Sequence, residues 1–558
     1  MKKTVILIFL MGFSLAAAVS AQTTDTRWYT ADSSATNFII STADELAGLA
    51  ELVNRGRNNF TGKTITLSNN IDLSAYTTGE GWTPIGRGGT TANNYRPFRG
   101  TFDGGNFVID NLTINYHNIN LLGLFGLIIG GRVENVRLEN VNIEGSSSDN
   151  VGGVAGFIDS NSHVINSYST GLINSKNGSG RHVGGVVGFV GFNSNVINCY
   201  STGTVGNTIS TYFINSYVGG VAGFVTDSSA IINSYSISMV IGNNYVGGIA
   251  GSVGRSIVNN CYFTGTVIGK GSGGSYIGGV VGGLGDGLIT NAYSTGAVTG
   301  IGQVGGVVGG VSWNSSVNNT YSTSVVNGRR HVGGVAGGVF MNGIVTNSAA
   351  LNPEVRSDSI VGLGRVIGYF DGNTLSNNIA YVGLTNKDGN TTWANIGEDN
   401  LDGANITIAE IKSDWTMGGR FVTENGWSIE NGWLFELDGE TVLLPSLQAI
   451  TTSVTPQSRQ RQIQSSSAFN MRVLSARNSI TNISYTLNTE STLSISVYNL
   501  KGKKIASQPK RLRTVGEHTF SFKTPKGFYI VEAKVQNKSG ESGRDAKHRV
   551  FTERVLVR

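Results

Sequence analysis

Three aspartates are the only acidic side chains between residues 151 and 350, and carboxylates are the usual acid and base groups of enzymes that cleave polysaccharides. Asp159, Asp227 and Asp286 each follow a similar glycine-rich segment. If every segment forms one coil of a stack, neighbouring aspartates lie two coils, or about 9 to 10 Å, apart, which is compatible with an inverting pair of carboxylates. A lone aspartate in a turn is more often a solvated turn former, so we expect no catalytic residue here.

Other motifs for catalysis or cofactor binding are absent from the sequence. It contains no HExxH zinc-protease motif and no GxxxxGK phosphate-binding loop, and its six histidines are scattered. The glycine-rich segments differ from a dinucleotide-binding fingerprint because they recur along the chain and open no helix. His182 and His331 merely precede two of these segments. We therefore expect no metal and no cofactor, and we predict that the protein is not an enzyme.

The glycine-rich segments are copies of a hexamer that recurs about every 30 residues. It reads LGLFGL at 122, VGGVAG at 151 and a degenerate LGRVIG at 363. Seven copies contain a glycine pair, at Gly152 and Gly153, Gly184 and Gly185, Gly219 and Gly220, Gly247 and Gly248, Gly278 and Gly279, Gly305 and Gly306, and Gly333 and Gly334. Glycine in a strand costs about 0.5 to 1 kcal/mol relative to alanine, so each pair needs a physical reason. Either the backbone turns a corner with positive φ, or the cross-section is so narrow that only hydrogen fits.

A second motif, VINSYSTG at 164 in its first copy, follows each full hexamer at nearly constant distance. Its tyrosines lie 15 or 16 residues after the first glycine, at Tyr168, Tyr200, Tyr235, Tyr262, Tyr293 and Tyr321. Its asparagines lie two places before the tyrosine position, at Asn166, Asn198, Asn233, Asn260, Asn291, Asn319 and Asn347. We expect the asparagines to stack as a ladder of side-chain amides. The tyrosines would form a stripe, which could bind sugar rings only if the aromatic faces point to solvent.

The composition of both motifs indicates strands, because β-branched and aromatic residues are frequent and proline is absent. A unit of 30 residues cannot bury a core alone, whereas stacked units share one. The sequence therefore predicts an all-β fold, a right-handed parallel β-helix or solenoid, with two fixed strands and one loop of variable length in each coil. The pattern leaves open which face of the hexamer points inward, since Val151, Gly153 and Ala155 alternate with Gly152 and Val154.

The flanking segments predict export and capping. Lys2 and Lys3 precede an apolar run that ends at Ala21, as in a secretory signal peptide, and no later stretch is long and apolar enough for a transmembrane helix. Thr42 and Glu45 predict a capping box before a short helix that would cover the open end of the stack. The predicted divisions are a signal peptide at 1–21, a lead-in at 22–35, an N-terminal cap with the first coils at 36–121, about nine repeats at 122–385, a C-terminal cap at 386–450, a linker at 451–470 and a small antiparallel β-sandwich at 471–558.

The charge is divided unevenly along the chain. Of the net +5, residues 451–558 carry +13, from 19 basic and 6 acidic side chains, and residues 22–450 carry −10. A basic tail could bind nucleic acid, but on an exported protein we favour a solvated small domain. The two cysteines, Cys199 and Cys261, precede tyrosines two coils apart, which is too far for a disulfide, so we predict that both are free.

The paired motifs VGGVAG and VINSYSTG resemble the GLUG repeat, a short module of large bacterial surface proteins that include adhesins and relatives of IgA proteases. The stretch from TADELAGLAELVN at 42 to FRGTFDGGNFVIDNLTI at 98 looks like the leader of such repeats in Bacteroidetes-type proteins. The C-terminal segments VYNLKGKKI, GEHTFSF and TPKGFYIVEAKV are similar to the sorting domains read by type IX secretion systems. This resemblance implies passage across the outer membrane, with secretion machinery as a partner of the tail.

The sequence leaves three functions open. The favoured hypothesis is a monomeric, non-enzymatic surface or secreted protein that is adhesin-like and binds glycan or host or matrix protein along the solenoid face. The second is a carbohydrate-active enzyme, a polysaccharide lyase or glycosidase, which would need a groove with convergent acidic and basic side chains. The loops after the second motif, or the tryptophan-rich residues 386–450, could contain such a groove. The third is a structural spacer.

Overall fold

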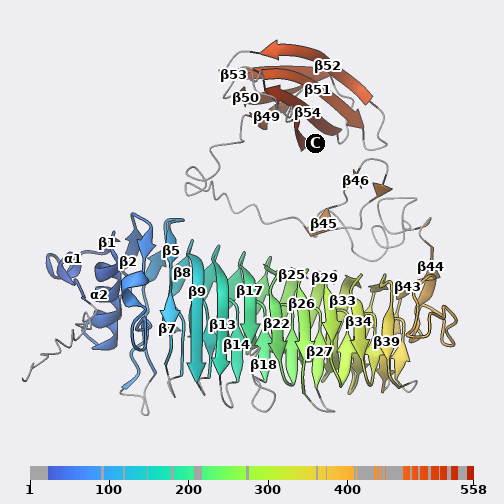
Figure 1. The fold of residues 1–558 in the computed structure, drawn as a ribbon, viewed down its shortest axis with the longest axis horizontal. Helices are drawn as coiled ribbons and strands as arrows, with labels where there is room; N and C mark the ends of the chain where they lie inside the picture. The colour runs from blue at the N-terminus through green and yellow to red at the C-terminus, as the bar shows by residue number, and fades with distance from the viewer. Residues whose placement is uncertain are drawn as a thin grey trace, which may run out of the picture. The chain divides into compact units, whose positions relative to one another are not determined.

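The computed structural model describes residues 23–410 apart from short gaps at 89–93, 117–119, 147–148, 177–180, 207–215, 272–274, 360–361, 372–373 and 408–409, and beyond residue 410 the backbone of a set of strands. The predicted signal peptide lies outside the described residues. The described fold is mostly β, a parallel β-solenoid of about ten turns with few helices (Figure 1). The chain divides into two compact units, Met1–Val454 and Thr455–Arg558.

Three parallel sheets line the solenoid, and we number them 1 to 3 by size, with 27, nine and eight strands. Sheet 2 contains β7 (Phe125–Ile129), β11 (Ala155–Asp159), β15 (Val187–Val190), β19 (Ala222–Thr226), β24 (Ala250–Gly254), β28 (Val281–Gly285), β32 (Val308–Ser312), β36 (Ala336–Val339) and β41 (Ile367–Phe370). Sheet 3 contains β10 (Val151–Gly152), β14 (His182–Gly184), β18 (Tyr217–Gly219), β23 (Tyr245–Gly247), β27 (Tyr276–Gly278), β31 (Gln303–Gly305), β35 (Val332–Gly333) and β40 (Leu363–Gly364).

Sheet 1 receives two or three short strands from each coil, and these strands contain the second motif. Its central members are β8 (Arg132–Glu134), β9 (Arg137–Ser146), β12 (His163–Ile165), β13 (Tyr168–Lys176), β16 (Asn195–Ile197), β17 (Tyr200–Gly206), β20 (Ala230–Ile232), β21 (Tyr235–Ser236), β22 (Met239–Gly242), β25 (Ile257–Phe263), β26 (Thr266–Gly269), β29 (Leu288–Ser294), β30 (Ala297–Thr299), β33 (Ser316–Ser322), β34 (Val325–Gly328), β37 (Ile344–Thr346), β38 (Ala349–Ala350), β39 (Val355–Ser357), β42 (Thr374–Ser376), β43 (Ile379–Tyr381) and β44 (Ala404–Ile406).

Equivalent residues of successive repeats pair directly in all three sheets. Val151 pairs with Val183 in sheet 3, Ala155 with Val187 in sheet 2, and Tyr168 with Tyr200 in sheet 1. One repeat is therefore one coil, and like side chains lie in files along the axis. Figure 1 shows the strands of successive coils side by side along the body.

The hexamer is not the single strand that its composition predicts. Its first half lies in sheet 3 and its second half in sheet 2, with a corner between Gly152 and Ala155. The corner also resolves the question of register, because Val151, Val154, Ala155 and Ile158 are all buried completely. The corner and the burial of both halves mean that neither face of the hexamer as a whole points outward.

The glycine pairs are explained by lack of space. None of them has a positive φ, which excludes the first of the two explanations. A Cβ on Gly152 would lie 2.6 Å from the backbone nitrogen of Gly188, and one on Gly153 would lie 2.7 Å from Cβ of Ser169, on the opposite wall of the coil. Real Cβ atoms essentially never approach this closely, so the narrow corner admits only hydrogen.

The first coils are covered by helix α2 (Ala43–Asn54), which follows a short helix α1 (Arg27–Thr30) and strand β1 (Asn37–Ile40). The predicted capping box is present: the Glu45 backbone nitrogen donates to Thr42 Oγ1, and Glu45 Oε2 accepts from the Thr42 backbone nitrogen. The helix buries Leu46 and Leu49 in the core. Strand β1 then begins the stack through parallel pairing with β2 (Thr64–Leu67), which pairs with β4 (Thr101–Asp103).

Beyond the last coil, Trp393 packs against the core and its Nε1 donates to the Leu384 carbonyl, 3.2 Å away. The other tryptophans of the predicted C-terminal cap belong to the residues whose side chains are not described. In the second unit the backbone forms antiparallel strands: β49 (Phe469–Arg477), β50 (Ile480–Leu487), β51 (Ser491–Asn499), β52 (Lys504–Arg513), β53 (Gly516–Lys523), β54 (Tyr529–Asn537) and β55 (Val550–Val557). The predicted sandwich remains a prediction.

Candidate functional site

The asparagines of the second motif lie at a bend within sheet 1, where they bond from coil to coil. The Nδ2 of Asn198 donates to Oδ1 of Asn166 at 2.9 Å, that of Asn233 to Asn198 at 3.2 Å, and that of Asn260 to Asn233 at 2.7 Å. Each of these four residues also has a positive φ, between 50° and 57°. Asparagine tolerates this left-handed backbone better than most residues, and that second role was not apparent from the sequence.

The asparagine ladder is longer at one end and less regular at the other than the motif alone predicts. It continues toward the N-terminus through Asn135, whose Nδ2 donates to Asp103 Oδ1 at 2.9 Å. In the other direction, Asn291 donates to Asn259 and Asn347 donates to Asn318, the residue before the expected partner in each case. The amide of Asn319 reaches Asn291 at 3.5 Å. The ladder is therefore a structural feature of the coil bend and offers no set of free ligand groups.

The tyrosines form one outward file on sheet 1, and their rings stack on one another. Neighbouring ring centroids from Tyr168 to Tyr321 lie 4.6 to 5.1 Å apart, with ring planes within 16° of parallel. Because each ring covers its neighbour, the file presents ring edges outward, and Tyr293 and Tyr321 are only 7% and 2% exposed. A platform of open aromatic faces for sugar rings, which the sequence left possible, is thus not present along this file.

The first tyrosine of the file is held by an acidic neighbour. The Tyr168 hydroxyl donates to Glu139 Oε1 at 2.7 Å. Burial raises the pKa of this hydroxyl well above its usual range, and the bond to Glu139 raises it further. Burial likewise raises the pKa of Tyr262 to about 12. These hydroxyls therefore stay protonated and act only as hydrogen-bonding groups, not as acids or bases, near neutral pH.

The two cysteines are free and buried, as predicted. Ser234 lies between them in the same inward file, and its Oγ accepts from the Cys199 backbone nitrogen at 3.1 Å. The Cys199 thiol lies 3.2 Å from the Ile197 carbonyl, two residues earlier in the chain. The hydroxyls of Ser167 and Ser234 donate to the equivalent carbonyls in their own coils. Burial raises the pKa of both thiols to about 12. Each cysteine therefore takes a serine's place in a structural file.

The three aspartates do not occupy equivalent positions in their coils. Asp159 is the last residue of its strand in sheet 2, where it pairs with Ile129. Asp227 and Asp286 are instead the first residues after their strands, one position later in the coil. Arg255 occupies the coil between Asp227 and Asp286, and its guanidinium forms an ion pair with Asp227. Among the described residues, no group of three or more His, Cys, Asp or Glu side chains is placed to hold a metal ion.

A second row of aromatic side chains, which sequence reasoning missed, lies on sheets 2 and 3 near the hexamer corner. The rings of Phe157 and Phe189 stack at 4.6 Å, and His182 contacts Phe189, Tyr217 and Phe224 at 5.2 to 5.4 Å. The stack continues to Tyr245 and Tyr276. The available signal was the residue before the first valine or isoleucine of each hexamer, which is His182, Tyr217, Tyr245 and Tyr276 in successive copies.

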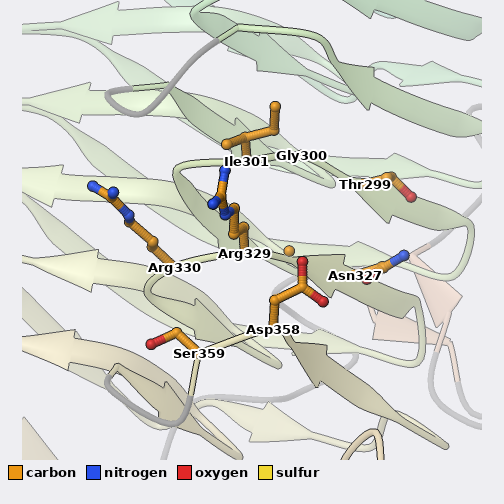
Figure 2. Close-up of a pocket in the computed structure, with 9 residues that line it drawn as sticks. Thr299, Gly300, Ile301, Asn327, Arg329, Arg330, Asp358 and Ser359 are labelled. Atoms are coloured by element: carbon orange, nitrogen blue, oxygen red, sulfur yellow. The ribbon is translucent and has the colours of Figure 1, made fainter.

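A hollow of about 740 Å³ lies where the third strands of three successive coils end (Figure 2). Thr299, Asn327 and Arg356 pair in register at the ends of β30, β34 and in β39. The lining then follows the chain past these strands to Gly300 and Ile301, to Gly328, Arg329 and Arg330, and to Asp358 and Ser359. This pocket belongs to the loops after the second motif, where the sequence left room for a groove.

Three charged residues line this pocket. Arg329, Arg330 and Asp358 are exposed, and their side chains form no ion pair with any other described residue. Figure 2 shows Arg329 reaching toward Ile301 of the preceding coil, while Arg330 points in another direction. Hydroxyl, amide, carboxylate and guanidinium groups thus line one concave surface.

A second pocket of about 380 Å³ lies nearer the N-terminus and is also rich in basic side chains, but most of these side chains bond to other groups of the protein. Its Arg99 Nη1 donates to the Ile129 carbonyl at 3.2 Å, its Arg132 pairs with Glu134 at 2.6 Å, and its Lys63 bonds to backbone carbonyls of residues 33–35. Burial lowers the pKa of His163 there, with Arg132 adding to the effect, so that histidine is neutral at pH 7. The charged groups of this second pocket are therefore largely occupied.

Comparison with known families identifies the repeat. Residues 179–206 and 242–268 each match the GLUG motif. The solenoid therefore contains GLUG motif repeats. Each matched segment runs through one coil, including a hexamer of sheets 2 and 3 and the second motif of sheet 1 that follows it. A comparison with curated proteins gives no match.

Two solved structures resemble this chain at low identity. One is described as a putative immunoglobulin A1 protease from Bacteroides ovatus, with 15% identity, a TM-score of 0.30, and coverage of 74% of this chain and 92% of that one. The other is the tailspike protein of E. coli bacteriophage HK620 in complex with pentasaccharide, with 11% identity, a TM-score of 0.30, and coverage of 83% of this chain and 80% of that one. A likeness this weak carries no information about function.

Proposed function

We propose that this chain is an exported, non-enzymatic repeat protein that is displayed on the cell surface or secreted and binds glycan in an adhesin-like manner. The observation that carries the proposal is the pocket of about 740 Å³ at the ends of β30, β34 and β39. Its volume is that of a ligand site, and its lining of hydroxyl, amide, carboxylate and guanidinium groups suits a hydroxyl-rich ligand. The sheets on either side hold these groups on a rigid frame.

The place of binding differs from the expectation of a tyrosine stripe. The stacked rings of sheet 1 leave edges at the surface, so they support the solenoid and contribute little to sugar recognition. Binding of a host or matrix protein along the same face is an alternative that immobilised matrix proteins would detect. Export by a signal peptide and a C-terminal sorting domain, and the secretion machinery as partner, are part of the proposal and rest on the sequence.

A carbohydrate-active enzyme is the second candidate, and the same pocket favours it, because acidic and basic side chains converge there. Two-carboxylate glycoside hydrolysis needs a pair of acids, whereas Asp358 is the only acidic residue that lines the described pocket. Arginine, in turn, is a poor general base because it stays protonated in proteins. Binding without turnover is therefore the function that the geometry supports best.

The test is a glycan array probed with the purified chain from Gln22 onward, together with incubation of the same chain with mixed polysaccharides. Binding without depolymerisation is the expected result. Release of oligosaccharide products would replace the proposal with the enzymatic alternative. Neither binding nor product would leave a structural spacer, and selective binding of immobilised matrix proteins alone would also overturn glycan recognition.

A further inference from the structure

The pocket at the ends of β30, β34 and β39 contains residues from two short connections. Residues 300–302 join β30 to β31, and residues 329–331 join β34 to β35, with three residues each. The lining residues come from three successive coils, so the depression spans about 10 Å along the axis.

Two exposed arginines, Arg329 and Arg330, line this depression. Arg132, Arg255 and Arg356 each form an ion pair, with Glu134, Asp227 and Glu354. Arg329 and Arg330 form none with the described residues, although both are exposed. Asp358 lines the same depression, so one carboxylate accompanies the two guanidinium groups and the charge of the lining stays positive. A guanidinium with open donors binds carboxylate or sulfate through two parallel hydrogen bonds.

The remaining lining narrows the class of ligand. The Asp358 carboxylate can accept hydrogen bonds from hydroxyl groups, and the Asn327 and Thr299 side chains can both donate and accept them. Asp358 would also repel a densely charged polyphosphate such as nucleic acid. A ligand that combines one acidic group with several hydroxyls fits both the basic and the acidic members of the lining.

We propose that this pocket binds an acidic sugar residue of a polysaccharide, with Arg329 holding its carboxylate or sulfate, Arg330 adding positive charge at the edge of the pocket, and Asp358 accepting hydrogen bonds from its hydroxyls. The inference rests on the proposed glycan-binding function and assigns it a ligand class and a location. Binding weakens as salt concentration rises, because the contact between charges at an exposed site is screened.

The test compares variants of the chain from Gln22 onward in titrations with three sets of oligosaccharides: uronate-containing, sulfated and neutral. The double variant Arg329→Gln, Arg330→Gln is expected to lose about tenfold or more in affinity for whichever acidic set, uronate-containing or sulfated, the parent chain binds. Asp358→Asn is expected to weaken binding severalfold. Arg255→Gln removes one exposed arginine outside the pocket and serves as the matched control, with unchanged affinity. The difference between uronate and sulfated ligands identifies the anionic group.

Several outcomes would overturn the inference while leaving glycan binding intact. These are equal affinity for neutral and acidic oligosaccharides, an equal effect of Arg255→Gln, or unchanged binding in the double variant. Tighter binding of single-stranded DNA than of any acidic glycan would point to polyphosphate instead. Absence of binding to every glycan would overturn the proposed function as well. Matching thermal unfolding curves establish that the exposed substitutions leave the solenoid folded.

Discussion

At the residue scale, one asparagine in each second motif both turns the backbone and bonds to the next coil. Asn233 has a φ of 50°, donates from Nδ2 to Asn198 and accepts at Oδ1 from Asn260. Both the left-handed backbone conformation and the bonding along the ladder favour asparagine at this position. Spacing alone predicted the hydrogen bonds, whereas the backbone angle depends on a bend in sheet 1 that no local pattern revealed.

Substitution of Asn233 separates these two roles. Asn233→Ala is expected to lower the free energy of unfolding by about 2 to 4 kcal/mol, because it loses two hydrogen bonds and places a Cβ residue without a local polar group in the left-handed region. Asn233→Gly keeps the backbone conformation and should lose about half as much. Urea denaturation followed by circular dichroism measures both. Equal losses for the two variants would mean that the backbone angle contributes nothing.

At the element scale, the corner between sheets 3 and 2 is the feature that the sequence described least well. The hexamer was predicted as one strand because its residues are uniformly apolar and small, and nothing in VGGVAG marks the turn between its halves. The repeat length, the parallel stack and the capping helix α2 were predictable, since periodicity and capping are local signals. The pocket was not, because its lining combines residues from three different coils.

The glycine pair at this corner gives a sharp test of the narrow cross-section. Gly220→Ala would force a Cβ against the carbonyl of Gly248 and the side chain of Ser236, and we expect a loss of about 3 kcal/mol or more. Gly254→Ala, in a neighbouring coil, is the matched control, because the nearest atom to its Cβ would be 3.6 Å away. Thermal unfolding of both variants measures the difference. A Gly220→Ala protein as stable as the Gly254→Ala protein would contradict the steric explanation.

The aromatic row on sheets 2 and 3 makes stability depend on pH. Burial lowers the pKa of His182 from 6.5 to about 4, with a smaller effect from Arg181, while its Nδ1 lies 2.6 Å from Asn150 Oδ1. Between these two values the unfolded chain binds the proton and the folded chain does not, so the contribution of His182 to stability falls as pH drops from about 6.5 to about 4. Above pH 6.5 the residue is neutral in both states and the effect disappears.

His182→Tyr isolates this effect, because the next coil already has tyrosine at the paired position 217. The variant keeps a ring in the stack and removes the titrating group. Its stability relative to the parent chain should rise by up to about 3 kcal/mol between pH 7 and pH 4. His163 and His331 titrate in both proteins and cancel in the comparison. A difference that is constant over this range would show that His182 is protonated in the folded chain.

At the scale of the whole molecule, the chain combines a rigid solenoid with a C-terminal unit of opposite charge. A stack of parallel coils has an open edge at each end, where the backbone of the terminal coil must be covered. Helix α2 covers the edge of the first coil. Residues 22–450 carry −10 and residues 451–558 carry +13, so the basic pI of the protein belongs to the tail. None of the helices in the described part of the chain has the length and apolar character to span a bilayer. The proposed function assigns delivery to the surface to the two ends of the chain.

Removal of the C-terminal unit tests that assignment. In cells of the native host, a chain lacking residues 471–558 should cross the inner membrane and accumulate in the periplasm, because the solenoid and signal peptide are intact and the proposed sorting signal is not. Cell fractionation and protease treatment of intact cells measure its position. A chain lacking only residues 451–470 keeps the signal and loses the polar linker, so it controls for shortening and should still reach the surface. Normal surface display of the chain without residues 471–558 would show that the tail has no part in export, whereas failure of the linker deletion alone would assign the requirement to spacing between the solenoid and the tail.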